Sequence, residues 1–292
     1  MDEKKILFVT KFEKLWFDAL ESMMDLRKVG YNHVVFLNVI ERDRVALHRG
    51  TGYQKSEEIR LREMANIRFI NWAETLFERG LEVGAYIVVG SLVKEVISAV
   101  EKEEIDLIVV GHEKKGRIEQ LYAGSDIVEI IRRSNTPVLV YKYKPDQTIA
   151  ADNLFQRPML ATRFSESCKI LFETLCDLHP AIQRIHVIHV VDPKNLKEPS
   201  GMGVQKTRKK IRKKLDEICD IFIEKGIDAT AGVYIGNTLQ EIENAAKEYN
   251  ASLVVTGISA KHALRERLIG STPKALADKS VFPTLLIPLK QE

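Results

Sequence analysis

Two stretches of the sequence decide the fold: LIVVGHEKKGRIEQLYAGSDIVEIIRRSNTPVLVY at residues 107–141, and LVVTGISAKHALRERLIGSTPKALADKSVFPTLLI at residues 253–287. Each begins with a continuously apolar run, passes through a glycine and a later Gly-Ser pair, and ends in a second apolar run. Apolar runs of strand length that alternate with amphipathic segments are typical of a parallel sheet with helices on both faces. The sequence therefore predicts an α/β fold.

The two stretches are copies of one unit. Gly111 aligns with Gly257 at an offset of 146 residues, and the two Gly-Ser pairs align at the same offset. A constant offset over several glycines is difficult to obtain by chance. We therefore predict a tandem duplication with doubly wound domains at residues 1–144 and 153–292, joined by a short linker.

A long helix is expected in each copy between the second and third strands. In the first copy it covers residues 56–79, and spacings of three and four predict one buried stripe. The members of this stripe are Ile67, Ile70, Ala73, Leu76 and Phe77. In the second copy the helix covers residues 206–225, and its stripe consists of Ile211, Leu215, Ile218 and Phe222.

Charge and composition restrict the kind of protein. The chain has 44 basic residues against 41 acidic residues, a net charge of +3, which argues against a nucleic-acid-binding protein. The basic run at residues 206–214 is expected to be a solvated helix face. Three cysteines without a CxxC pair favour reduced thiols over a disulfide framework or a zinc site. With no apolar run of roughly 18 residues and no signal-peptide layout, we expect a cytoplasmic protein that is not embedded in a membrane.

Two loops of each copy are candidate binding elements. In an open parallel sheet, ligands bind beyond the carboxyl ends of the strands, where the strand order reverses. One loop follows the first strand, and the other joins the fourth strand to the helix that begins with Gly-Ser. A serine hydroxyl beside the free N–H groups of a helix start suits a phosphate. The alternative is that the glycines only form turns and that Ser125 and Ser271 only cap helices.

These motifs resemble the universal stress protein family. The resemblance rests on a strand followed by Gly-x-x-Gly, nine residues and Gly-Ser, on the segment ATRFSE at residues 161–166, and on second strands at residues 37–41 and 188–192. It covers almost the whole chain, twice. It implies two tandem domains, each a five-stranded parallel sheet with helices on both faces, and one subclass of the family binds ATP or AMP.

The resemblance also implies two sets of nucleotide-binding residues. In the second copy they are Arg163, Val190, Gly257, Ala260, Gly270, Ser271 and Thr272. In the first copy they are Val39, Gly111, Lys114, Gly124 and Ser125. The backbone of Val39 or Val190 would meet the adenine, and the glycines and serines would surround the phosphates.

Both copies depart from the family pattern. The second loop glycine is Lys114 in the first copy and Ala260 in the second, and the aspartate that ends the first strand is Lys11 or Arg163. Lysine and arginine have no hydrogen-bond acceptor for a nucleotide, although a cation near a phosphate pocket attracts anions. Asp126 places a carboxylate where a phosphate would benefit from the helix dipole. We therefore favour the site in the second copy.

The leading hypothesis is a cytoplasmic stress-response or regulatory protein that binds an unidentified protein partner, with ATP or AMP bound in the second domain. The resemblance also implies an intramolecular pseudo-dimer that pairs the final strands, residues 138–141 and 284–287, and leaves a homo-oligomer open. The alternative is a nucleotide-free scaffold or a regulator of a membrane transporter. An enzyme that hydrolyses nucleotide is disfavoured, because the sequence offers no catalytic residue set and no metal site, and contains neither a Walker A motif nor a G-x-G-x-x-G motif after its first strand.

Overall fold

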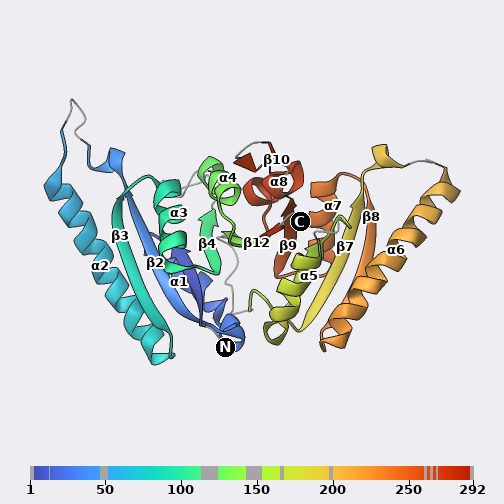
Figure 1. Ribbon diagram of the computed structural model, residues 1–292, viewed down its shortest axis with the longest axis horizontal. Helices are drawn as coiled ribbons and strands as arrows, with labels where there is room; N and C mark the ends of the chain where they lie inside the picture. The colour runs from blue at the N-terminus through green and yellow to red at the C-terminus, as the bar shows by residue number, and fades with distance from the viewer. Residues whose placement is uncertain are drawn as a thin grey trace. The chain divides into compact units, whose positions relative to one another are not determined.

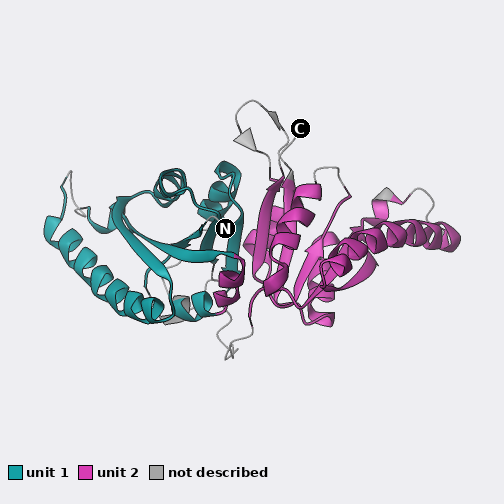
Figure 2. Ribbon diagram, turned by 60° about the horizontal axis from the view of Figure 1, so that its bottom comes forward, with its two compact units in different colours: residues 1–21, 30–143 teal, residues 22–29, 144–292 magenta. Residues whose placement is uncertain are grey.

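The structure is a computed structural model that describes residues 3–12, 14–46, 52–112, 124–142, 153–164, 168–196, 200–259, 262–263, 266–267 and 269–289 (Figure 1). The chain divides into two units (Figure 2). Unit 1 contains Met1–Glu21 and Gly30–Tyr143, and unit 2 contains Ser22–Val29 and Lys144–Glu292.

Unit 1 is built on five parallel strands in the order β3-β2-β1-β4-β5. The strands are β1 (Lys4–Val9), β2 (Tyr31–Glu41), β3 (Glu82–Gly90), β4 (Leu107–His112) and β5 (Val138–Lys142). The α-helices are α1 (Lys14–Glu21), α2 (Lys55–Glu78), α3 (Leu92–Glu103) and α4 (Gly124–Arg133), and the short 3-10 helices are η1 (Met24–Val29), which belongs to unit 2, and η2 (Arg42–Arg44).

Unit 2 repeats this topology with the strand order β12-β9-β6-β7-β8. Its strands are β6 (Pro158–Ala161), β7 (Arg184–Val191), β8 (Asp228–Ile235), β9 (Leu253–Ser259) and β12 (Thr284–Leu289), and β10 (His262–Ala263) pairs with β11 (Glu266–Arg267) in a separate antiparallel ribbon. The helices are α5 (Cys168–Asp177), α6 (Gly201–Glu224), α7 (Thr238–Glu248) and α8 (Ser271–Lys279), with η3 (His179–Ala181) and η4 (Pro193–Asn195).

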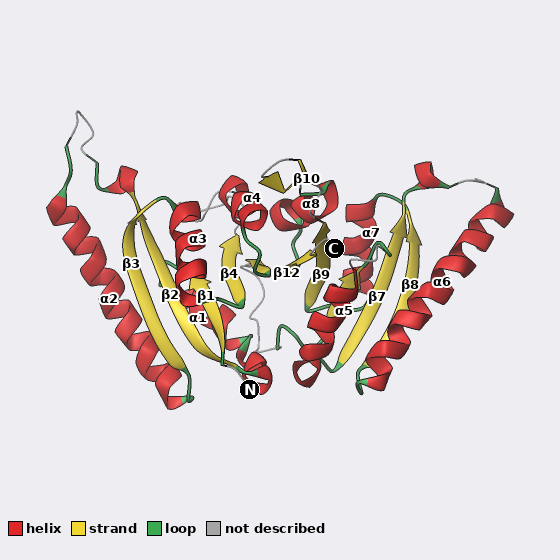
Figure 3. Ribbon diagram, viewed as in Figure 1, coloured by secondary structure: helices red, strands yellow, loops and turns green. Residues whose placement is uncertain are grey.

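Helices cover both faces of each sheet, so the predicted doubly wound α/β class is confirmed (Figure 3). In unit 1, α1 and α2 share one face, since Phe17 packs against Trp72 with ring centroids 5.3 Å apart. In unit 2, Phe172 of α5 and Phe222 of α6 meet in the same way at 6.5 Å. The strands between these layers are apolar on both sides, as in Leu7 and Phe8, which are both fully buried.

The predicted stripe of α2 is wrong in part. Ala73 and Leu76 are buried, but Ile67, Ile70 and Phe77 are 61%, 53% and 59% exposed. Residues three apart are separated by about 300° around the helix axis, about 60° short of a full turn. In a series of such steps, each side chain therefore lies about 60° further from the buried face than the one before. The buried face of α2 is instead centred on Trp72 and Leu76. The stripe of α6, whose spacings alternate between four and three, is confirmed for Leu215, Ile218 and Phe222, which are buried, whereas Ile211 is half-buried.

Candidate functional site

The strand order places the candidate site of unit 2 at the carboxyl ends of β6 and β9. The order reverses between these two strands, because the chain passes from β6 to β7 on one side and from β9 to β12 on the other. The loop after β6 begins with Thr162, and α8 begins with Ser271 near the same edge. This edge is where an open α/β sheet binds its ligands.

The loop after β6 is held by hydrogen bonds across the sheet. The Thr162 N–H donates to the carbonyl oxygen of Ile188 at 3.0 Å, and Nδ1 of His189 lies 2.7 Å from the Thr162 carbonyl oxygen. Phe164 has a φ of 57°, and its N–H lies 3.5 Å from the Thr162 hydroxyl. The aromatic ring of Phe164 then rests on His189, with ring centroids 4.6 Å apart.

Unit 1 repeats this loop with different side chains. The Phe12 N–H donates to the Thr10 hydroxyl at 2.8 Å, its φ is 56°, and the Asn38 amide donates to the Thr10 carbonyl oxygen at 2.9 Å. The threonine hydroxyl contact and the positive φ of the phenylalanine therefore recur in the loops of both units. The Phe12 ring differs from Phe164 because it is 3% exposed and packs against Phe36 and Trp72.

Arg163 lies against the start of α8. Its Nη2 donates to the hydroxyl of Thr272 at 3.1 Å. A Cβ atom added to Gly270 would be 3.7 Å from Nη1 and 3.9 Å from Nη2 of this guanidinium group. The structure thus brings Arg163, Gly270, Ser271 and Thr272 together.

A positive φ does not explain Gly257 or Gly270. Among the described residues, the glycines with positive φ are Gly30, Gly80 and Gly226, none of which belongs to the candidate site. Gly270 has φ −59° and ψ 156°, a conformation that any residue adopts. A Cβ on Gly257, within β9, would lie 2.7 Å from Cδ1 of Leu289 in β12. The glycine there leaves room for the Leu289 side chain.

The remaining predicted residues are distributed along both units. Val190 is half-buried in β7, two positions before Asp192, and Val39 is buried in β2. Gly111 lies in β4 opposite Tyr141 of β5. Gly124 and Ser125 are the first two residues of α4. Lys114 and Ala260 lie outside the described residues.

The charge around the unit 2 site is positive. Nζ of Lys214, on α6, lies 5.4 Å from the centroid of the Phe164 ring. Burial lowers the pKa of His189, and the charges of Arg163 and Lys214 lower this pKa further. Two cationic side chains, Arg163 and Lys214, therefore lie near His189.

The corresponding place in unit 1 is acidic. Burial raises the pKa of Asp126 at the start of α4, and the nearby Glu41 carboxylate raises it further. These two carboxylates oppose a phosphate at the helix start. The helix start of unit 1 therefore differs in charge from that of unit 2, where Arg163 lies beside α8.

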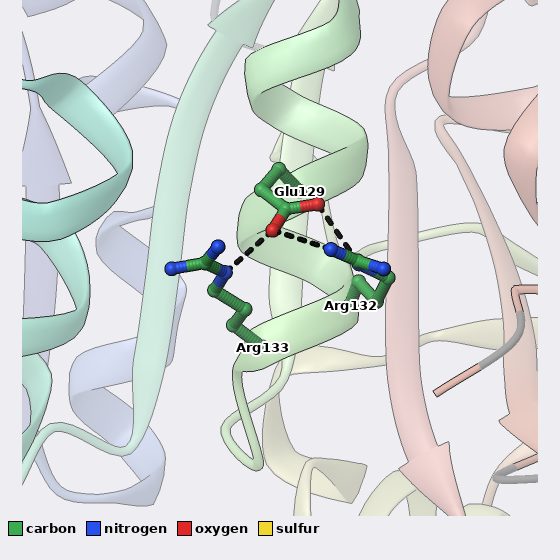
Figure 4. Close-up of polar contacts among 3 residues, drawn as sticks. All are labelled: Glu129, Arg132 and Arg133. Atoms are coloured by element: carbon green, nitrogen blue, oxygen red, sulfur yellow. Dashed lines mark hydrogen bonds and ion pairs between the residues drawn. The ribbon is translucent and has the colours of Figure 1, made fainter. Parts of the chain in front are cut away.

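The arginines of α4 do not offset this acidity. Figure 4 shows Arg132 and Arg133 pointing toward Glu129, which accepts hydrogen bonds from Arg132 at 2.8 and 2.7 Å and another from Arg133. These hydrogen bonds lower the pKa of Glu129, with Arg132 making the largest contribution. Both arginines lie in the last turn of α4, whereas Asp126 lies in its first turn, and Glu129 lies between them.

Two features at the amino ends of the strands escaped the sequence analysis. In unit 1, ligand atoms of Glu3, His33 and Glu82 all lie within 4.8 Å of one another on the protein surface. In unit 2, a cavity of about 140 Å³ is lined in part by His186 and Tyr249. Both depend on the register between strands that are distant in the sequence, and no local pattern predicts them.

The His186 side chain is buried in an unusual environment. Its Nδ1 lies 2.8 Å from the Thr230 hydroxyl, and its ring stacks on Tyr249. Its Nε2 is buried without a hydrogen-bond partner. Burial lowers the pKa of His186 to about 4.

The fold and the site together define a tandem α/β protein with a candidate ligand site at a sheet switch point. A family model described as the universal stress protein family matches residues 3–142 and 155–288. The chain belongs to the universal stress protein family. In the part of the chain that the structure describes, the helices are too short or too polar to cross a membrane.

Individual relatives agree with this assignment. Universal stress protein MJ0577 of Methanocaldococcus jannaschii is 32% identical over 155 residues, which is 48% of this chain and 96% of that protein. A universal stress protein from Archaeoglobus fulgidus has a similar fold, with a TM-score of 0.73 at 19% identity over 99% of this chain and 100% of that chain. A putative universal stress protein from Pseudomonas aeruginosa gives a TM-score of 0.65 at 18% identity, covering 98% and 94% of the two chains.

Proposed function

We propose that the protein is a cytoplasmic regulatory protein that binds ATP or AMP at the carboxyl edge of unit 2 and acts through a protein partner. The observation that carries this proposal is the convergence of the α8 start with the guanidinium group of Arg163. A helix N-terminus and a cation at one place provide both hydrogen-bond donors and positive charge for a phosphate.

The nucleotide is proposed to lie across the ends of β6, β7 and β9. The backbone of Val190 would contact the adenine, and the phosphates would lie between Gly257 and α8. The first turn of α8 offers the backbone N–H groups of Ser271 and Thr272, but Pro273 has none. Two backbone donors are fewer than an ordinary helix start provides, so side-chain donors have a larger share in binding.

Unit 1 is proposed to bind no nucleotide. Its phosphate position faces the carboxylates of Glu41 and Asp126, and its first loop is filled by the packed ring of Phe12. One functional site per chain is therefore expected.

The second candidate is a nucleotide-free scaffold, as in a regulator of a membrane transporter. The acidic unit 1 site favours it, because one of the two copies already lacks the features of a phosphate site. ATP or AMP retained by the purified protein would separate the two functions, and release of phosphate over time would instead indicate a hydrolase.

The test is isothermal titration of the full chain with ATP and with AMP. We expect one site per chain in the wild type and at least a tenfold loss of affinity in Gly270→Val, where a branched side chain blocks the phosphate approach. The variant is expected to fold, since the added Cβ would meet Pro273 at 3.6 Å, an ordinary contact distance.

Gly124→Val at the equivalent helix start of unit 1 is the matched control and is expected to bind like the wild type. Equal losses in both variants, or two sites per chain, would contradict the assignment to unit 2. If neither nucleotide gives heat at about 1 mM, nucleotide binding is wrong and the scaffold function is preferred.

A further inference from the structure

We propose that the outer edge of unit 1, formed by α2 and β3, binds the same edge of a second copy of this chain in an antiparallel arrangement. β3 is the last strand of the unit 1 sheet, and α2 packs beside it (Figure 1). Unit 2 has the equivalent edge on α6 and β8, so the duplication supplies an internal comparison. This association does not depend on whether unit 2 binds a nucleotide.

Two hydrogen bonds show which flank of α2 faces this edge. The Arg68 side chain donates to the carbonyl oxygen of Lys11 at 3.3 Å, just after β1, so its flank faces the middle of the sheet. The Arg62 side chain donates to the carbonyl oxygen of Ile87 in β3, so the other flank faces the edge. At about 100° per residue, four exposed residues lie about 40° to 80° beyond Arg62 and form the edge flank of α2: Ile59, Asn66, Ile70 and Phe77.

The backbone of β8 shows which groups of an outer strand face solvent. The N–H group of Gly236, just after β8, donates to the carbonyl oxygen of Val191 in β7 at 3.1 Å. Backbone groups alternate in direction along a strand, so even-numbered residues of β8 face β7 and odd-numbered residues face outward. Ala231 and Val233 therefore present their carbonyl groups to the outer edge.

Two arginines of α6 cover these carbonyl groups in unit 2. Arg212 donates to the carbonyl oxygen of Ala231 at 2.8 Å, and Arg208 donates to that of Val233 at 3.2 Å. Covering an edge strand in this way hinders another strand from pairing with it. At the offset of 146 residues, the contact of Arg62 in unit 1 repeats the contact of Arg208.

The edge of β3 is less covered. The counterpart of Arg212 is Asn66, and among the described residues no hydrogen bond joins its side chain to the carbonyl oxygen of Ala85, the counterpart of Ala231. β3 consists of nine residues without proline, and Glu82 is its one charged residue. A long, apolar edge strand is available for pairing with another chain.

The edge flank of α2 is also more apolar than its counterpart. Ile59, Ile70 and Phe77 are 47%, 53% and 59% exposed. Successive members of the edge flank are seven, four and seven residues apart, a spacing typical of helices that pack along one another. The equivalent positions of α6 are Gln205, Arg212, Asp216 and Ile223. Since α6 shows that a solvated flank needs few apolar residues, the contrast indicates that the flank of α2 packs against another chain.

The edge flank is complementary to itself about a two-fold axis. Antiparallel packing places Ile59 of one chain near Phe77 of the second copy, with Asn66 and Ile70 between them. The outer edges of two β3 strands are antiparallel in the same arrangement, so their free backbone groups can pair.

The charges of α2 favour the antiparallel direction. Lys55 is exposed at the start of the helix, and Glu74 and Glu78 are exposed near its end. Antiparallel packing brings the cation of each chain toward the carboxylates of the other, whereas parallel packing places like charges together.

The size of the edge flank sets the expected affinity. From Ile59 to Phe77 the helix extends about 27 Å, and a surface of this length and one helix width lies at the low end of specific interfaces. We expect a dimer with a Kd of about 10–100 µM. At about 1 µM the chains are separate, so unfolding at that concentration measures the single chain.

The experiment is sedimentation equilibrium of the full chain at concentrations from about 1 to 200 µM, which bracket the expected Kd. One variant gives α2 the residues of α6 at three exposed positions: Ile59→Gln, Asn66→Arg and Ile70→Asp. It is expected to keep its fold, which circular dichroism checks, and to dimerise at least about tenfold more weakly than the wild type. Ile223→Asp on α6, at a position that is 54% exposed, is the matched control and is expected to dimerise like the wild type.

Asn66→Arg alone tests the edge of β3 and replaces the triple variant if that variant does not fold. It adds the arginine that covers β8 in unit 2, and it is expected to weaken the dimer at least about threefold. A wild type that remains monomeric at about 200 µM would overturn the inference. So would a dimer that survives in the triple variant and in Asn66→Arg, or one that Ile223→Asp weakens equally.

Discussion

Replacement of Trp72 by alanine is expected to destabilise unit 1 by about 3–5 kcal/mol, the range for truncating a large aromatic side chain in a core. Trp72 is 9% exposed and connects α2 to three other aromatic rings. Its ring centroid lies 5.2 Å from that of Phe12, 5.3 Å from Phe17 and 5.6 Å from Phe36. The substitution removes apolar burial and leaves a cavity beside the loop that follows β1.

Phe77→Ala is the matched control on the same helix. Phe77 is 59% exposed, so its truncation is expected to change stability by less than about 0.5 kcal/mol. Urea unfolding followed by circular dichroism measures both variants. Similar losses in the two variants would show that the buried face of α2 is assigned incorrectly.

Acidification from pH 7 to pH 5 is expected to destabilise unit 2 by about 2 kcal/mol through His186. The pKa of His186 is lowered from 6.5 to about 4, first by burial and then by the charge of Arg212, while a hydrogen bond with Thr230 opposes the shift. The unfolded chain takes up this proton as the pH falls below 6.5, but the folded unit does not do so until the pH approaches 4. The contribution of neutral His186 to the free energy of unfolding is fully present above pH 6.5 and falls as the pH decreases toward 4.

His186→Phe is expected to remove this pH dependence and to stabilise unit 2 at pH 5. Phenylalanine retains an aromatic ring against Tyr249, and the buried Nε2 that it removes has no hydrogen-bond partner. Thr230 is exposed, so its hydroxyl can bond to water in the variant. His179→Gln, at an exposed position, serves as the control. Its free energy of unfolding should depend on pH as that of the wild type does. Urea unfolding at pH 7, 6 and 5 measures the free energy of unfolding of each variant. If this free energy depends on pH in His186→Phe as it does in the wild type, other groups cause the pH dependence.

Much of the fold is predictable because it depends on local patterns. Continuous apolar runs locate the strands, and alternating spacings of three and four residues identify the buried face of α6. The repeat and the family follow from the spacing of glycines and of Gly-Ser pairs. The stripe of α2 is predicted only in part because both sides of this helix carry apolar residues. Contact with Phe12 and Phe36 decides which side is buried.

The sequence alone determined the parallel α/β architecture and the duplication, because strand patterns and connection rules are local. Only the tertiary structure decided which side chains meet at the candidate site. Arg163 and Thr272 are 109 residues apart, and they come together because β6 and β9 are hydrogen-bonded neighbours and α8 follows β9. The contact that a Cβ on Gly257 would make with Leu289, on the adjacent strand, arises in the same way. Contacts of this kind depend on register and packing between segments that are distant in sequence, and no spacing of residues along the chain specifies them.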